Sequence, residues 1–113
     1  MDMTGPRETL CRLADIPEGG VLGVNPPDPD GEPLVLARRG SSVQAWLNIC
    51  PHAGRRMDYA PGLFLVKDDK LTCAVHGATF ALREGGLCVA GPCRGQSLVA
   101  VAVQVRDGLV TRA

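Results

Sequence analysis

The stretch that decides the fold begins with Cys50-Pro51-His52 and ends with Cys73-Ala74-Val75-His76. Twenty residues separate His52 from Cys73, and the chain contains no histidine besides these two. Each Cys–His pair follows a run of β-prone residues and opens into a turn. We therefore expect each pair at the tip of a loop. Two loops that meet at their tips can bring Cys50, His52, Cys73 and His76 to one metal site.

Two cysteines and two histidines fit two kinds of site. One is a tetrahedral structural zinc site. The other is a [2Fe–2S] cluster with two thiolates on one iron and two imidazoles on the other. Common zinc fingers place both cysteines before both histidines, whereas the order here is Cys-His and then Cys-His. This order favours a binuclear cluster, because each loop then supplies one ligand to each iron. A zinc-stabilised interaction module is the alternative.

The rest of the chain has the pattern of an all-β protein. Its 14 glycines and 9 prolines are spread as turn signals between short β-prone runs, with no sustained helical period. Asp107-Gly108 between two alternating runs is a strong hairpin signal. The chain length fits one domain, residues 1–113, built as a small antiparallel sandwich or barrel. We expect strands over residues 8–16, 21–24, 34–38, 43–49, 63–66, 70–74, 78–82, 87–90, 98–106 and 109–112.

The charge balance argues against several classes of partner. Lys plus Arg and Asp plus Glu both number 12, so the chain lacks the basic excess of a nucleic-acid-binding protein or a polybasic membrane anchor. No run approaches the roughly 20 apolar residues of a membrane helix, and the first ten residues lack the apolar core of a secretory signal. We expect a cytoplasmic protein with no nucleic-acid or membrane partner. Its odd count of five cysteines argues against a disulfide framework.

The spacing C-x-H followed by C-x-x-H resembles the signature of the Rieske iron–sulfur proteins. Residues 48–54 are similar to the first ligand loop of that family, residues 73–80 to its second, and Gly91-Pro92 to the proline loop that covers the cluster from a third side. The resemblance implies a Rieske-like antiparallel β sandwich or barrel with a cluster-binding subdomain at about residues 46–93. The gap between the loops is a few residues longer than in compact members, which suggests an insertion near residues 58–70.

The resemblance also implies roles for the four ligands. Cys50 and Cys73 would bind the inner iron of a [2Fe–2S] cluster. His52 and His76 would bind the outer iron and offer an exposed imidazole edge to a docked partner. The chain would then be an electron carrier rather than an enzyme, similar to the ferredoxin component of multi-component oxygenases. Its expected donor is a flavin-dependent reductase, and its expected acceptor is an oxygenase or other redox enzyme. The small subunit of a nitrite-reductase-like complex is an alternative.

Four positions separate this chain from the quinol-oxidising Rieske proteins that it resembles. Those proteins carry a disulfide between positions that are Arg55 and Val75 here. They also carry Ser and Tyr hydroxyls at positions that are Ala78 and Phe80 here. Neither of these side chains can donate a hydrogen bond to the cluster. With fewer donors the reduced state is less stabilised, so we expect a potential near the low end of the Rieske range, roughly −150 mV.

The remaining cysteines allow two interpretations. Cys88 and Cys93 flank Gly91-Pro92, and Cys11 lies in the first expected strand. Small buried core residues are the simpler interpretation for all three. A redox pair formed by Cys88 and Cys93 is the alternative.

Three larger side chains also bear on the expected site. Trp46, four residues before the first ligand, is expected to be a packing anchor. Arg55 and Arg56 follow His52. They either dock an acidic partner or form a solvated loop face.

Overall fold

The computed structural model describes residues 9–25, 32–51, 56–58, 63–73, 77–91 and 94–113. Across these ranges the chain forms short strands and two single-turn 3-10 helices, so the predicted all-β class is confirmed. The elements are β1 (Thr9–Arg12), η1 (Leu13–Asp15), β2 (Val21–Val24), β3 (Leu34–Arg39), β4 (Ser42–Leu47), β5 (Leu65–Lys67), β6 (Lys70–Thr72), β7 (Thr79–Ala81), η2 (Leu82–Glu84), β8 (Leu87–Ala90), β9 (Ala100–Val101), β10 (Val103–Arg106) and β11 (Leu109–Arg112).

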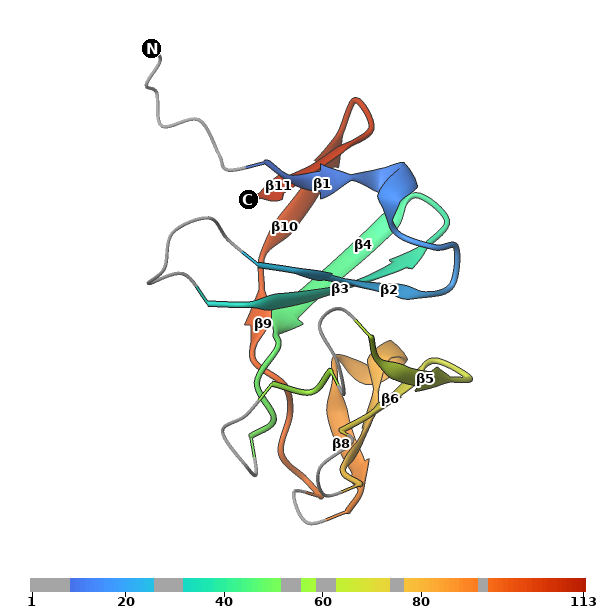
Figure 1. Cartoon of the computed structure of the whole chain (residues 1–113), viewed down its shortest axis with the longest axis vertical. Coiled ribbons are helices and arrows are strands. Elements are labelled where there is room, and N and C mark those ends of the chain that lie inside the picture. Colours follow the sequence, from blue (N-terminus) through green and yellow to red (C-terminus); the bar gives the residue numbers. More distant parts are fainter. Residues whose placement is uncertain (1–8, 26–31, 52–55, 59–62, 74–76, 92–93) are drawn as a thin grey trace.

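The strands form three antiparallel sheets with the orders β1-β11-β10, β2-β3-β4-β9 and β5-β6-β7-β8. Figure 1 shows the first two sheets together in one half of the molecule and the third sheet in the other half. We call the first two sheets the base and the third the outer sheet. The chain enters the outer sheet after β4 and returns to the base at β9, so the outer sheet is one continuous excursion from the base.

The central strands of the base are buried on both faces. Leu34, Val35 and Leu36 are consecutive in β3, and none is more than 1% exposed. Successive side chains of a strand point to opposite faces. Leu34 and Leu36 accordingly join the core of the base, while Val35 joins the core beneath the outer sheet. In β4, Ala45 and Trp46 divide between the same two cores. The sheet β2-β3-β4-β9 is therefore the wall that both cores share.

Trp46 links this wall to the outer half, as expected of a packing anchor. Its ring is 1% exposed, and its Nε1 donates a hydrogen bond of 3.1 Å to the carbonyl oxygen of Gly85. At the next residue, Gly86, an added Cβ would lie only 2.9 Å from that nitrogen, and the φ angle is +82°. Glycine is required there because the indole occupies the space of a side chain.

The first expected strand ends earlier than the sequence predicts. Residues 8–16 were expected to be extended, but the strand stops at Arg12 and η1 follows. The Asp15 carboxylate accepts a 3.0 Å hydrogen bond from the backbone N–H of Arg12 and so draws the chain into a turn. Arg38 Nη1 then donates to the carbonyl oxygens of Leu13 and Ile16, at 3.3 and 3.1 Å. A distant arginine thus supplies the donors that these turn carbonyls need.

The expected strand over residues 98–106 is divided between two sheets. β9 pairs with β4, whereas β10 pairs with β11. Between them, the carbonyl oxygen of Ala102 accepts a 3.0 Å hydrogen bond from the N–H of Ala113. Both halves of the segment are extended, as the alternating pattern predicts, but they pair with strands of different sheets.

Two hairpins have tight turns, and the one at Asp107-Gly108 confirms a turn signal in the sequence. Asp107 and Gly108 have φ angles of 53° and 76°, as a tight turn between β10 and β11 requires. Asp68 and Asp69, with φ angles of 52° and 62°, make the corresponding turn between β5 and β6. Aspartate is one of the few residue types that tolerate this left-handed conformation.

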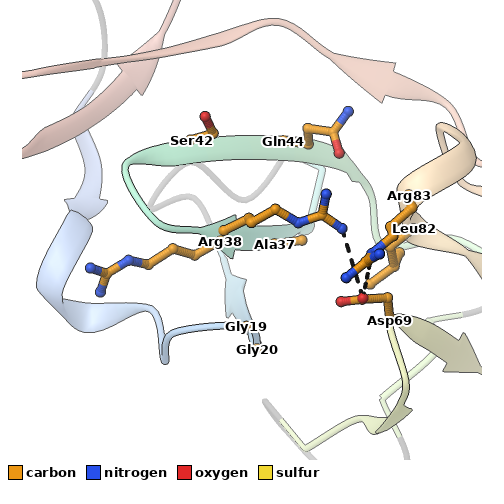
Figure 2. Close-up of a pocket in the computed structure, with 10 residues that line it drawn as sticks. Gly19, Gly20, Ala37, Arg38, Ser42, Gln44, Asp69, Leu82 and Arg83 are labelled. Atoms are coloured by element: carbon orange, nitrogen blue, oxygen red, sulfur yellow. Dashed lines mark ion pairs between the residues drawn. The ribbon is translucent and has the colours of Figure 1, made fainter.

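Asp69 also connects the outer sheet to the base. Its Oδ2 lies 2.6 Å from Nε of Arg83 and 3.7 Å from Nη2 of Arg39, which belongs to β3. Figure 2 shows the Asp69 carboxylate and Arg83 at one side of a cleft of about 290 Å³ between the two halves. These ion pairs are partly exposed, so each contributes at most about 1 kcal/mol. The apolar wall, rather than this cleft, carries most of the connection.

Within the described ranges, no helix has the length and apolar character needed to cross a membrane.

Replacing Trp46 by Phe tests the shared wall. The change removes the hydrogen bond to Gly85 and part of a buried ring, so we expect the free energy of unfolding to fall by about 1–3 kcal/mol. Urea unfolding should be followed by circular dichroism, because the chain has one Trp and the variant has none. Leu109→Ala, at a side chain that is 39% exposed, is the control and should change stability by about 0.5 kcal/mol or less. Equal losses in both variants would contradict the role of Trp46.

Candidate metal centre

The two predicted thiolate ligands lie in one core. Cys50 follows β4 and Cys73 directly follows β6, yet both are fully buried members of the core cluster beneath the outer sheet. Neither takes part in a disulfide among the cysteines that the structure describes. His52 and His76 lie outside the described residues. The fold therefore brings together the cysteines of two segments that are distant in sequence, each at the start of a predicted ligand loop.

Asn48 holds the first ligand loop from inside. Its side chain is fully buried, and its Oδ1 accepts a 2.9 Å hydrogen bond from the backbone N–H of Met57. Its Nδ2 donates to Oδ1 of Asp58 at 3.2 Å, and its own backbone N–H donates to the carbonyl oxygen of Pro33 at 2.8 Å. One amide side chain thus joins the two ends of the segment that contains Cys50.

Arg56 and Asp58 extend this network to the base. The Asp58 side chain is 2% exposed and accepts two hydrogen bonds from Arg56, 3.2 Å from Nε to Oδ1 and 3.0 Å from Nη2 to Oδ2. Arg56 Nη1 also donates to Oδ1 of Asn25, just past β2, at 2.9 Å. Hydrogen bonding to Asp58 raises the pKa of the Arg56 guanidinium in spite of its burial.

This pairing adds to the interpretation of Arg56. We expected its charge to dock a partner or to form a solvated loop face; the side chain is 43% exposed, in keeping with a loop face, and its guanidinium pairs with the Asp58 carboxylate of the same loop. Arg55 lies outside the described residues. The role of Asn48 was not predicted, and its signal in the sequence is a polar residue at the end of an apolar β-prone run.

The second ligand loop is held by its own backbone. The N–H of Cys73 donates to the carbonyl oxygen of Ala78 at 2.7 Å, and the N–H of Gly77 donates back to the carbonyl oxygen of Cys73 at 3.0 Å. Gly77 has a φ angle of +72°, a conformation that suits glycine. Backbone hydrogen bonds thus join the two described ends of the second loop, and the Thr79 hydroxyl also donates to the carbonyl oxygen of Gly77 at 3.4 Å.

A third segment lies against the second loop. At Gly91, where φ is +95°, an added Cβ would lie 2.7 Å from Cα of Ala78 and 3.1 Å from the carbonyl oxygen of Gly77. The two backbones thus approach as closely as glycine permits. This contact agrees with the expected position of the Gly91-Pro92 segment, although Pro92 lies outside the described residues.

The other cysteines behave as packing residues where the structure describes them. Cys88 is 1% exposed in the same core, and its thiol donates to the carbonyl oxygen of Ala90 at 3.2 Å. Cys11 is half-buried between the sheets of the base. Burial raises the pKa of its thiol, and the nearby Asp15 raises it further. Cys93, the other member of the considered redox pair, lies outside the described residues.

These features fit a buried iron–sulfur cluster. Thiolates are the ligands that hold such clusters, and both candidate thiols lie in an apolar core. Ala78 and Phe80, which follow the second loop, are fully buried and carry no hydroxyl. The close approach of Gly91 adds backbone around the second loop. Apolar side chains thus surround the two candidate thiols.

Several solved structures are similar to this chain over nearly its whole length. The ferredoxin of carbazole 1,9a-dioxygenase from Nocardioides aromaticivorans IC177 is 27% identical, with a TM-score of 0.72 over 95% of this chain and 96% of that chain. A ferredoxin from Sphingomonas yanoikuyae B1 is 20% identical, with a TM-score of 0.74 over 95% of this chain and 97% of that chain. At this lower identity the likeness shows the fold alone.

A third similar structure is a complex of reduced oxygenase and oxidized ferredoxin in carbazole 1,9a-dioxygenase. It is 24% identical, with a TM-score of 0.74 over 94% of this chain and 91% of the matched chain, and it too shows the fold alone. No curated protein has a significantly similar sequence.

The family comparison covers the same part of the chain as the structural evidence. The Rieske [2Fe-2S] domain model matches residues 8–106, which include both Cys–His pairs and the elements from β1 to β10. The cofactor of such a domain is a [2Fe–2S] cluster. The chain therefore belongs to the family of Rieske [2Fe-2S] domains.

Proposed function

We propose that this chain is a one-electron carrier whose [2Fe–2S] cluster is held by Cys50, His52, Cys73 and His76. The observation that carries the proposal is the burial of Cys50 and Cys73 in one core at the starts of two loops. We assign these two thiolates to the inner iron and the two histidines to the outer iron. Residues 46–93 are then the cluster-binding subdomain within a single domain of residues 1–113.

The core around the thiolates bears on the direction of the potential. The cluster, when bound, accepts and releases one electron. Met57, Leu71 and Phe80 pack in the same core as Cys50 and Cys73, and none is more than 1% exposed. Such surroundings keep water away from the sulfur ligands and disfavour the additional negative charge of the reduced state. The chain is thus built for a low potential, which suits a carrier filled by a reductase.

We propose a flavin-dependent reductase as the donor and an oxygenase or similar redox enzyme as the acceptor. The support for the acceptor is the likeness to the ferredoxin of carbazole 1,9a-dioxygenase, together with a solved complex of oxygenase and ferredoxin in that system. On this proposal the chain passes electrons between enzymes and converts no substrate of its own.

Substituting one buried cysteine at a time tests the ligand assignment. Cys73→Ala should abolish the visible absorption of the cluster together with bound iron and acid-labile sulfide. Cys88→Ala should keep all three, because Cys88 is equally buried in the same core but is not an assigned ligand. Loss of the cluster in Cys88→Ala, or zinc in place of iron in the unaltered protein, would contradict the proposal.

The reduction potential tests the kind of carrier. Voltammetry of the purified protein should show a reversible one-electron wave near the low end of the Rieske range, roughly −150 mV, that is nearly constant around neutral pH. A strongly positive potential that falls near neutral pH would instead place the chain with quinol-oxidising proteins.

Adding hydroxyl groups beside the second loop should raise that potential. In the double variant Ala78→Ser/Phe80→Tyr, a hydroxyl hydrogen bond to the cluster sulfurs or cysteines would stabilise the reduced state. Ala45→Ser is the control, because Ala45 is buried in the core of the base and not in the core that holds Cys50 and Cys73. An unchanged potential in the folded double variant would refute the assigned role of these two positions.

A further inference from the structure

The two ligand loops are fastened by different means. The second loop is closed by backbone hydrogen bonds between Cys73, Gly77 and Ala78. The first loop depends on side chains that reach its far end from inside and from the base. We propose that Asn48, Asp58 and Arg56 form a latch that positions the first ligand loop and thereby slows loss of the cluster. This inference rests on the proposed function, because it concerns retention of the cluster.

Packing alone does not explain why Asn48 is an asparagine. Its side chain is fully buried. An apolar residue of similar size would fill the same volume without the desolvation cost of an amide. An apolar side chain, however, could not accept the N–H of Met57 and donate to Asp58 at the same time. The two hydrogen bonds of Asn48 join the beginning and the end of the segment that holds Cys50.

Hydrogen bonds between Asp58 and Arg56 reinforce this connection. The Asp58 carboxylate, at 2% exposure, accepts from Asn48 Nδ2 and from two nitrogens of Arg56. Paired forks of this kind fix orientation as well as charge. Removing one partner of a buried ion pair is costly, because it leaves a charge in a poorly solvated place. Arg56 also bonds Asn25 beside β2, so the latch connects the end of the loop to the base.

A latch and general stabilisation predict different consequences. If the network only stabilised the fold, its loss would loosen both ligand loops together. If it positions the first loop, its loss frees residues 51–58 and leaves the backbone-closed turn at 73–78 unchanged. Hydrogen exchange resolved along the chain separates these outcomes, because the amide of Met57 is one of the protected groups.

The test compares the cluster-loaded protein with two latch variants, Asn48→Ala and Arg56→Gln. In each we expect deuterium exchange in residues 51–58 to accelerate by about tenfold, the factor for loss of one net hydrogen bond, with exchange in residues 77–91 within about twofold of wild type. The half-life of the visible cluster absorption in the presence of an iron chelator should shorten by a similar factor. Arg56 is 43% exposed, so its variant carries the test if Asn48→Ala does not fold.

Asp69→Asn is the matched control. Like Arg56→Gln it removes one charge of an arginine–aspartate pair, but at the cleft between the base and the outer sheet and away from the ligand loops. We expect its cluster half-life and its exchange in residues 51–58 to stay within about twofold of wild type. Equal acceleration in Asp69→Asn, or equal acceleration of residues 77–91 in the latch variants, would overturn the proposal in favour of general loosening.

A double variant checks that the pair acts as a unit. Arg56→Gln removes the charge of Arg56 from beside the Asp58 carboxylate, whereas Arg56→Gln/Asp58→Asn removes both charges and keeps an acceptor for Asn48. The double variant should therefore retain the cluster longer than Arg56→Gln alone. Additive losses would refute the coupling. Absence of a [2Fe–2S] cluster from wild type would refute the proposed function instead, while unchanged exchange in residues 51–58 would refute the latch alone.

Discussion

Burial of the β2-β3-β4-β9 sheet on both faces is the constraint on which the rest of the structure depends. Val35 and Trp46 face one core, whereas Leu34, Leu36 and Ala45 face the other. Because one sheet serves both cores, the outer sheet cannot shift without exposing side chains of the base. The hydrogen bond from Trp46 to the carbonyl oxygen of Gly85 fixes the orientation of the indole ring in this apolar contact. The core that holds Cys50 and Cys73 consequently includes side chains of β3 and β4, and Figure 1 shows the outer half next to these strands.

The ends of the two ligand loops are held together by different kinds of hydrogen bond. The second loop is short enough for backbone hydrogen bonds to close it, and Gly91 supports it by close backbone contact. The first loop is longer, so its ends meet through Asn48 and the buried Asp58. Side-chain hydrogen bonds to charged groups are individually strong but fail together when one partner is lost. The position of the first loop therefore depends on side chains more than that of the second.

The positive charge of Arg56 in the first loop shows that the sequence position of a cation does not reveal its partners. Arg56 looks like a docking residue because it follows a candidate ligand and carries a positive charge. The structure assigns that charge to Asp58 and Asn25, which neutralises it within the chain. A cation can attract a partner only with the charge that its own neighbours leave uncompensated. The surface through which this chain meets its partners therefore cannot be read from the position of Arg56.

The sequence by itself determined the all-β class, the turn at Asp107-Gly108, and the family, because these depend on residue type, alternation and spacing along a short stretch. It also placed Cys50 and Cys73 at the starts of two loops. Only the tertiary structure decided that residues 98–106 divide between two sheets and that residues 13–15 leave the first strand. It alone revealed that Asn48 closes a ligand loop. These outcomes depend on partners such as Arg38, Ala113 and Asp58, and no local pattern specifies which distant group will supply a donor or an acceptor.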